Sequence, residues 1–117
     1  MSKNILVVDD DPGSLNFISH FLRKDGYEVT EARHGAEAVE LIENARFDLV
    51  LTDVRMPRLD GVTLALHVRS RIPTIPIILM TAGVPFDLTP TLGSNLPCLS
   101  KPISLDELRS NIQRALF

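Results

Sequence analysis

The sequence has no tryptophan and a single cysteine, Cys98. A lone cysteine cannot form an internal disulfide and excludes a multi-cysteine zinc site. The first residues also lack a long apolar run: only four apolar residues, Ile5 to Val8, precede the acidic Asp9. A secretion signal or a membrane span needs a much longer run. These absences predict a cytoplasmic protein with no membrane attachment.

Positive charge is also scarce, with 12 Lys and Arg residues against 15 Asp and Glu residues and a formal net charge of −3. Nucleic-acid binding needs a dense basic stripe that neutralises successive phosphates. We therefore expect no direct nucleic-acid binding by this chain. An apolar share of 44% and a charged share of 23% are typical of a globular protein. The length suits a single domain over residues 1–117.

Short apolar segments alternate with segments of helical spacing along the chain. The predicted strands are residues 5–8, 27–32, 47–52, 75–80 and 96–100. The predicted helices are residues 14–24, 36–45 and 60–69, and a last helix that begins with a capping-box pattern at Ser104 and Glu107. Between Gly83 and Pro97, several prolines and glycines make a fourth helix short or irregular. The alternation predicts an α/β fold with a five-stranded, doubly wound parallel sheet.

Side chains outside the strand ends are expected to have structural roles. Phe17, Phe21 and Phe47 are predicted to lie in the core, and Cys98 to pack as a small unreactive apolar residue. The second helix is expected to bury Ala38, Leu41, Ile42 and Ala45, and the last helix Leu105, Leu108, Ile112 and Leu116. His20, His34 and His67 lack metal-ligand spacing, so surface or helix-end positions are expected.

Polar residues stand where four of the predicted strands end. Asp9 and Asp10 follow the first strand, Asp53 the third, Thr81 the fourth and Lys101 the fifth. Carboxyl ends of parallel strands meet at one edge of a sheet, where ligands bind, so these side chains should converge. Each residue alone also has a purely structural interpretation: a helix start for Asp9 and Asp10, a strand-end cap for Asp53, a β-forming residue for Thr81 and a surface charge for Lys101. Asp11 is expected to be such a helix start.

The converging set indicates phosphoryl chemistry with a cation. Carboxylates about 4 Å apart repel by roughly 4 kcal/mol per pair at an effective dielectric near 20, so a cation is needed among them. Oxygen ligands suit Mg²⁺ better than zinc. A lysine and a threonine opposite the metal would cradle phosphoryl oxygens, and an aspartate can serve as the nucleophile.

Four segments resemble the signature blocks of response-regulator receiver domains, in the family order. They are Ile5-Leu6-Val7-Val8-Asp9-Asp10, Leu51 to Pro57 with Asp60-Gly61, Thr81-Ala82, and Lys101-Pro102. The resemblance covers essentially the whole chain. It implies a flavodoxin-like receiver fold with strand order 2-1-3-4-5, and Asp53 as the phospho-acceptor. It also implies Mg²⁺ bound directly by Asp10 and mainly through water by Asp9, with Asp53 and the carbonyl of Arg55 as further ligands.

The resemblance also implies how the site responds and which partners it has. Thr81 would turn toward the phosphoryl group, Lys101 would pair with its oxygens, and Pro102 would follow a cis peptide bond. The phosphoryl donor would be a sensor histidine kinase or a phosphotransfer protein. The chain would act as a two-component signalling switch on a downstream output domain or protein target, with a homodimer as one option, and not as an enzyme with a separate substrate.

Two other functions stay open at this point. A pseudo-receiver would keep the fold as an interaction module without phosphorylation. Cys98 keeps this reading open, because the receiver family usually has a tyrosine or phenylalanine there, three residues before the lysine. An aspartyl-phosphate phosphatase of the haloacid dehalogenase type would place its nucleophile at Asp9, although Gly13 stands where that family expects Thr or Val. The position of a trapped acyl phosphate, Asp9 or Asp53, distinguishes the two chemistries.

Overall fold

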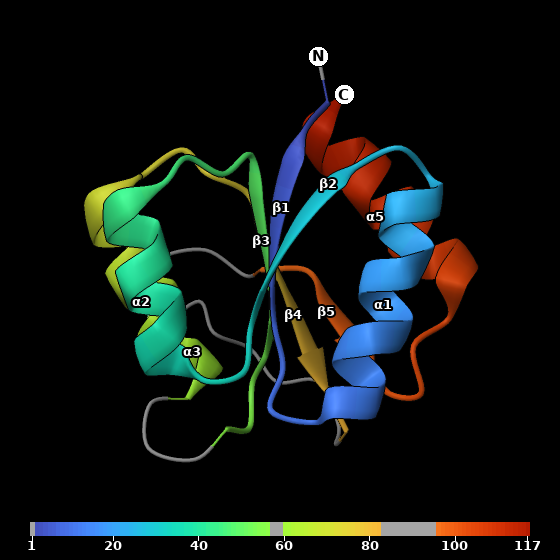
Figure 1. The fold of residues 1–117 in the computed structure, drawn as a ribbon, viewed down its shortest axis with the longest axis horizontal. Helices are drawn as coiled ribbons and strands as arrows, with labels where there is room; N and C mark the ends of the chain where they lie inside the picture. Colours follow the sequence, from blue (N-terminus) through green and yellow to red (C-terminus); the bar gives the residue numbers. More distant parts are fainter. Residues whose placement is uncertain (1, 57–59, 83–95) are drawn as a thin grey trace.

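The computed structural model describes residues 2–56, 60–82 and 96–117, and Figure 1 shows one parallel sheet between helices. The strands are β1 (Asn4–Val8), β2 (Glu28–Ala32), β3 (Leu49–Asp53), β4 (Ile77–Thr81) and β5 (Cys98–Ser100), in the order β2-β1-β3-β4-β5. The helices are α1 (Pro12–Lys24), α2 (Gly35–Asn44), α3 (Gly61–Arg71) and α5 (Leu105–Leu116). The predicted α/β fold and strand order are confirmed. The expected irregular fourth helix falls on residues 83–95, which lie outside the described residues.

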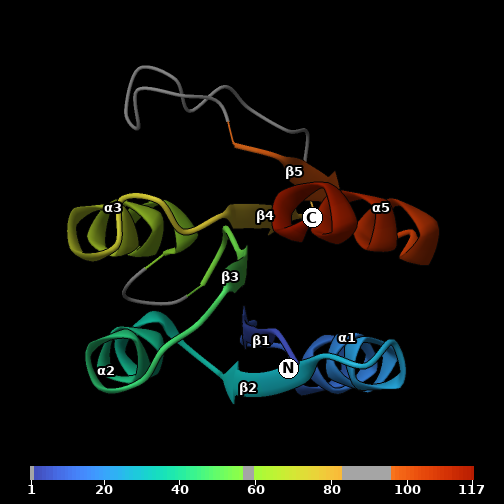
Figure 2. The same cartoon turned by 90° about the horizontal axis from the view of Figure 1, so that it is seen from above.

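The sheet separates two helical layers, with α1 and α5 on one face and α2 and α3 on the other (Figure 2). Alternate strand residues point to opposite faces, so that Leu6 and Val50 pack on the α2 and α3 side while Ile5 and Leu49 pack on the α1 and α5 side. Every residue of β3 and β4 is buried. Cover on both faces explains why these strands are continuous apolar runs rather than alternating ones.

Each described helix begins at a residue whose side chain accepts a hydrogen bond from a backbone N–H group of its first turn. The capping residues are Asp11, His34, Asp60 and Ser104, with acceptor distances of 3.2, 3.1, 2.8 and 3.3 Å. The expected helix-start role of Asp11 and the helix-end position of His34 are therefore confirmed. At the other end of α1, Gly26 has a φ of 95°, a left-handed conformation that terminates the helix.

Two expectations about the core are wrong. The side chain of Phe17 is 55% exposed, because it lies beside the buried stripe of α1 rather than on it. Phe21 also lies beside that stripe but is partly buried, and the guanidinium of Arg109 on α5 stands 4.9 Å from its ring centre. Ala45 is exposed because α2 ends at Asn44 and the chain at Ala45 is extended.

The two remaining predictions about single side chains agree with the structure. Cys98 is partly buried against the core cluster on the α2 and α3 side, and burial raises the pKa of its thiol. His20 is exposed, and His67 pairs with Glu43 of α2 at 3.1 Å on the surface. No helix in the described ranges is long and apolar enough to cross a membrane.

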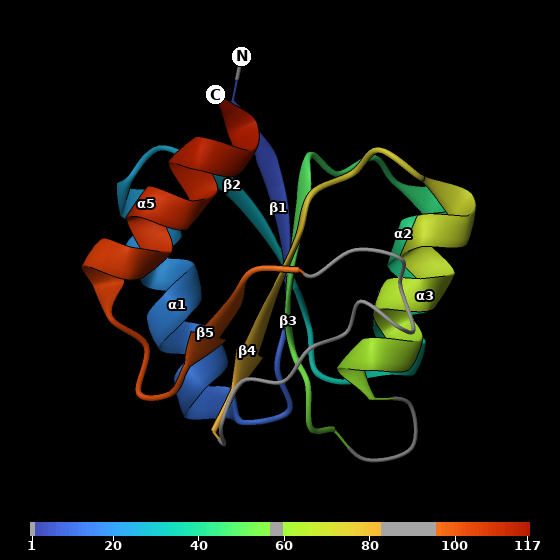
Figure 3. The ribbon, with the colours of Figure 1, turned by 180° about the vertical axis from the view of Figure 1, so that it is seen from behind.

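One edge of the sheet is formed by β2, and no strand among the described residues lies on its outer side. Arg23 of α1 reaches over this edge and donates from its guanidinium to the carbonyl oxygen of Val29 at 3.2 Å. The same guanidinium lies 3.9 Å from the carboxylate of Glu31. Arg23 thereby occupies an acceptor that β2 would otherwise present to solvent. Figure 3 shows the opposite edge, where β5 lies outside β4.

Candidate functional site

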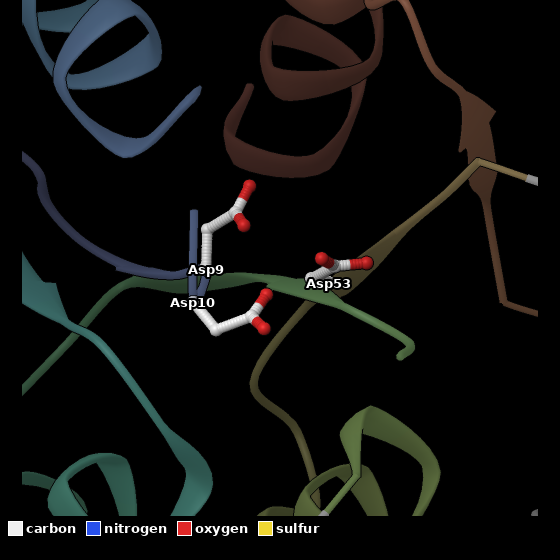
Figure 4. Close-up of side chains that lie close together, drawn as sticks. All are labelled: Asp9, Asp10 and Asp53. Atoms are coloured by element: carbon white, nitrogen blue, oxygen red, sulfur yellow. The ribbon is translucent and has the colours of Figure 1, made fainter. Parts of the chain in front are cut away.

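Three aspartates meet at the carboxyl edge of the sheet (Figure 4). Asp9 and Asp10 follow β1, and Asp53 is the last residue of β3. One carboxylate oxygen from each residue lies within 4.8 Å of the others. Asp9 is fully buried, Asp53 is 6% exposed and Asp10 is exposed. The predicted convergence of these side chains is therefore present, in a site that opens to solvent on the Asp10 side.

Lys101 lies between two of these carboxylates. Its Nζ donates to Asp9 Oδ2 at 2.9 Å and to Asp53 Oδ2 at 3.2 Å. The lysine follows β5 directly, and its backbone N–H donates to the carbonyl oxygen of Thr81 at 2.7 Å. The peptide bond between Lys101 and Pro102 is cis, as the family resemblance implied. The β5 end thus places one ammonium group against the carboxylates that follow β1 and β3.

The charges of this group perturb one another. Burial raises the pKa of Asp53, and the Asp9 carboxylate raises it further, while the hydrogen bond and charge of Lys101 lower it without cancelling the rise. Burial alone would lower the pKa of Lys101. The hydrogen bonds and charges of Asp9, and then of Asp53, outweigh that effect and hold the pKa above its usual value. Lys101 is therefore charged at neutral pH, and it faces more carboxylates than it can balance.

Thr81 and Arg55, the other residues predicted for the site, lie at the same edge. Thr81 is the last residue of β4 and is buried, and its carbonyl oxygen holds the backbone of Lys101. Arg55 is exposed, and its N–H donates to Asp53 Oδ1 over a long 3.4 Å. The structure thus brings every predicted site residue to one edge of the sheet.

The donor set of this edge fits a small divalent cation. Carboxylate oxygens are the ligands that Mg²⁺ prefers, and the acidic group contains no cysteine or histidine that would favour zinc. Three aspartates whose oxygens lie within 4.8 Å of one another carry more negative charge than one lysine neutralises. This excess of negative charge favours the binding of a cation on electrostatic grounds alone.

Two features of the site were not predicted from the sequence. Lys101 was assigned to phosphoryl oxygens and Asp9 to a water-mediated metal contact, but in the structure the two side chains bind each other across 92 residues of sequence. The second feature lies behind Asp53, where Gly61 packs against the main chain. For the contact between Lys101 and Asp9, the sequence signal was only that both residues follow predicted strands. The signal for the second was a glycine at the first position of a helix, where a glycine is not otherwise needed.

Comparison with known proteins gives the same picture. The sequence profile of the family described as "Response regulator receiver domain" matches residues 5–113. The transcriptional regulatory protein GlrR of Escherichia coli (strain K12) is 35% identical over 115 residues, which are 97% of this chain and 26% of that protein. The chain therefore spans about a quarter of the length of the curated relatives that it matches first.

Solved structures agree with this match. The chemotaxis protein CheY4 of Vibrio cholerae is 31% identical, with a TM-score of 0.90 over 99% of this chain and 100% of that one. The response regulator protein TrrA of Thermotoga maritima, solved in complex with Mg(2+)-BeF, is 31% identical, with a TM-score of 0.89 over 97% of this chain and 99% of that one. This chain belongs to the response regulator receiver domain family, and its acidic pocket is of the type found in phosphoacceptor signalling switches rather than in classical enzymes.

Proposed function

We propose that Asp53 accepts the phosphoryl group and that residues 1–117 act as a single receiver domain. The observation that carries this assignment is the contact of Lys101 Nζ with both Asp53 and Asp9 beside a third carboxylate. Of the two carboxylates that the lysine binds, Asp9 is fully buried whereas Asp53 keeps 6% exposure. Asp10 is exposed, and Lys101 binds the other two carboxylates instead. Asp53 is thus both accessible to a phosphoryl donor and in contact with the ammonium group of Lys101.

Mg²⁺ would be held by Asp9, Asp10 and Asp53, with the backbone carbonyl of Arg55 as a further ligand. When bound, the ion would neutralise charge on the carboxylates and on the phosphoryl oxygens. The close approach of the three carboxylates supports this set. The complex of the relative TrrA with Mg(2+)-BeF supports the choice of metal.

The proposed reaction is a transfer between two side chains. A carboxylate oxygen of Asp53 attacks the phosphorus of a phosphohistidine on a sensor histidine kinase or a phosphotransfer protein. The O–P bond forms as the N–P bond breaks, and the leaving imidazole keeps the electron pair and takes up a proton. Lys101 then pairs with the new phosphoryl oxygens, and the Thr81 hydroxyl turns toward them. The product is an acyl phosphate on this chain.

The acyl phosphate would act by shifting a two-state surface rather than by creating a new fold. Its reader would be a downstream output domain or a protein target. The relative GlrR is named a transcriptional regulatory protein, and a DNA-binding output in a longer protein would agree with the lack of a basic stripe here. A homodimer and a cytoplasmic location remain predictions of the sequence.

The experiment uses acetyl phosphate as donor, with and without Mg²⁺, and intact mass as the readout. We expect one added phosphoryl group on the wild-type chain with Mg²⁺ and none without it. Asp53→Asn should show no adduct, because its amide is not a nucleophile of this kind. Asp106→Asn, an exposed aspartate of α5, is the matched control and should label like the wild type.

The outcomes separate the alternatives. An adduct that persists in Asp53→Asn and is lost in Asp9→Asn would favour the phosphatase chemistry. A wild-type chain that binds Mg²⁺ but accepts no phosphoryl group from acetyl phosphate or from a histidine kinase would be a pseudo-receiver, and the proposal would be wrong.

A further inference from the structure

Gly61, the first residue of α3, lies against the main chain that carries Asp53. A Cβ atom at position 61 would stand 2.2 Å from the carbonyl oxygen of Asp53, 2.8 Å from Val54 Cα and 3.0 Å from the carbonyl carbon of Asp53. All three atoms belong to the backbone, so no rotamer change can relieve the clash. Any larger residue must push α3 and the end of β3 apart.

The close approach, and not the backbone conformation, requires this glycine. Gly26 is the described glycine with a positive φ, and Gly61 has no such angle. A first helical position accepts most residues without strain. By contrast, a Cβ atom at Gly13, in the first turn of α1, would meet nothing nearer than 3.9 Å.

Hydrogen bonds hold the same stretch of main chain from both sides. The N–H of Val54 donates to the carbonyl oxygen of Met80 in β4 at 2.8 Å, and the N–H of Gly61 donates to the carbonyl oxygen of Val54 at 2.9 Å. The hydroxyl of Thr52 donates to the carbonyl oxygen of Asp53 at 3.0 Å. The peptide after Asp53 is thus clamped between β4 and α3.

The Asp53 carboxylate is joined to this clamped main chain through only its own Cα and Cβ atoms. A shift of the peptide therefore moves the carboxylate relative to Lys101 Nζ, which it meets at 3.2 Å, and relative to Asp9, which the same Nζ meets at 2.9 Å. Misplacing a reacting group by about 1 Å can slow a reaction on the order of 100-fold. Phosphoryl transfer should be sensitive to this contact.

We propose that Gly61 is a positioning residue for phosphoryl transfer. By carrying no side chain, it lets the first turn of α3 fix the main chain of Asp53 and Val54, and so sets where the Asp53 carboxylate meets Lys101. This inference rests on the proposed role of Asp53 as the acceptor. It gives the Asp60-Gly61 pair a task beyond starting a helix.

The test compares Gly61→Ala with Gly13→Ala, a second first-turn glycine with room for a methyl group. With acetyl phosphate and saturating Mg²⁺, Gly61→Ala should be labelled at least tenfold more slowly than the wild type, and Gly13→Ala within about twofold of it. A second readout needs no metal. Hydrogen exchange at the Val54 amide should be at least tenfold faster in Gly61→Ala, relative to the Leu51 amide in the same strand.

A third variant separates positioning from simple loss of stability. Leu64→Ala removes a fully buried side chain from the same helix and adds no atom beside the Asp53 main chain. If Leu64→Ala slows labelling as much as Gly61→Ala at equal stability, the positioning role is wrong. If Gly61→Ala does not fold, Thr52→Val decides. This variant removes the hydroxyl bound to the Asp53 carbonyl without adding bulk, and an unchanged labelling rate would overturn the proposal.

The failure of this inference can be told from the failure of the proposed function. A wild-type chain that is never phosphorylated refutes the role of Asp53. A wild-type chain that is phosphorylated on Asp53, together with a Gly61→Ala variant that matches it in rate and in Val54 exchange, refutes only the role of Gly61.

Discussion

At the scale of single residues, one ammonium group serves two carboxylates that are almost completely removed from solvent. Lys101 binds Asp9 and Asp53, yet burial still raises the pKa of Asp53. A carboxylate whose pKa is raised on folding destabilises the folded state wherever it is ionised. The charge arrangement that prepares the site for a cation and a phosphoryl group is thus a source of instability in their absence.

Asp53→Asn should therefore be more stable than the wild type at pH 7.5 without metal, by about 1 kcal/mol, a size typical of single substitutions. The folded wild type holds its proton on Asp53 to higher pH than the unfolded chain does, so its stability falls as pH rises through the window from the ordinary pKa of 3.8 up to the raised value. The amide lacks this loss. Urea unfolding from pH 3.5 to 7.5 measures the difference.

The advantage of Asp53→Asn should shrink toward the acidic end of that range, where Asp53 of the wild type is protonated. An advantage that stays constant with pH would mean that Asp53 has no raised pKa. Asp106→Asn, at an exposed position, serves as the control for a general charge effect.

At the scale of elements, the sequence predicted all five strands and the described helices, but most predicted strands began too early. Phe47, Ile75 and Leu96 stood at predicted strand starts, whereas the strands begin two residues later in each case. All three side chains are buried. An apolar pattern indicates burial, and the chain becomes buried before it joins the hydrogen-bonded sheet. The pattern therefore cannot locate the first residue that pairs with a neighbouring strand.

The starts of α2, α3 and α5 were predicted to within one residue, because capping is a local property of a few side chains, whereas α1 begins at Pro12, two residues before its predicted start. Ser104→Ala should destabilise the protein by about 1 kcal/mol, since the N–H of Glu107 loses its acceptor at 3.3 Å. Urea unfolding at neutral pH measures the change. Ser110→Ala, at an exposed position within the same helix, loses only an exposed hydrogen bond from Arg114 at 3.2 Å and should be close to neutral because alanine favours helix interiors. Equal losses in both variants would contradict a capping role.

At the scale of the whole molecule, the location of the site could be predicted from the topology, but the pairing of its side chains could not. Residues as distant as Asp9 and Lys101 could be placed together because parallel strands end at one edge. The carboxylates that the Lys101 ammonium group contacts are set by side-chain rotamers and by local charge. Strand order carries no information on either. The close contact of Gly61 with the Asp53 main chain likewise depends on how deeply α3 packs against the sheet.

Mg²⁺ should stabilise the whole fold, because a ligand that binds only the folded state adds free energy to it. At ten times its Kd the expected gain is about 1.4 kcal/mol, which raises the Tm of a domain of this size by roughly 5 °C. Asp10→Asn should lose most of this gain with little change in metal-free stability, because Asp10 is exposed. Thermal unfolding with and without Mg²⁺ tests both statements. Glu40→Gln, an exposed carboxylate on α2, should keep the full gain.

The arginine that covers β2 also bears on how copies of the protein behave when they are crowded together. A free sheet edge is a template on which a second copy can add its own edge strand, and growth of that kind leads to aggregates. Here an approaching β2 would have to displace Arg23 from Val29 and bring its own Glu28 and Glu31 beside another acidic strand. The β2 edge of the sheet therefore resists self-templated assembly, and we expect any specific pairing of two copies to use another part of the surface.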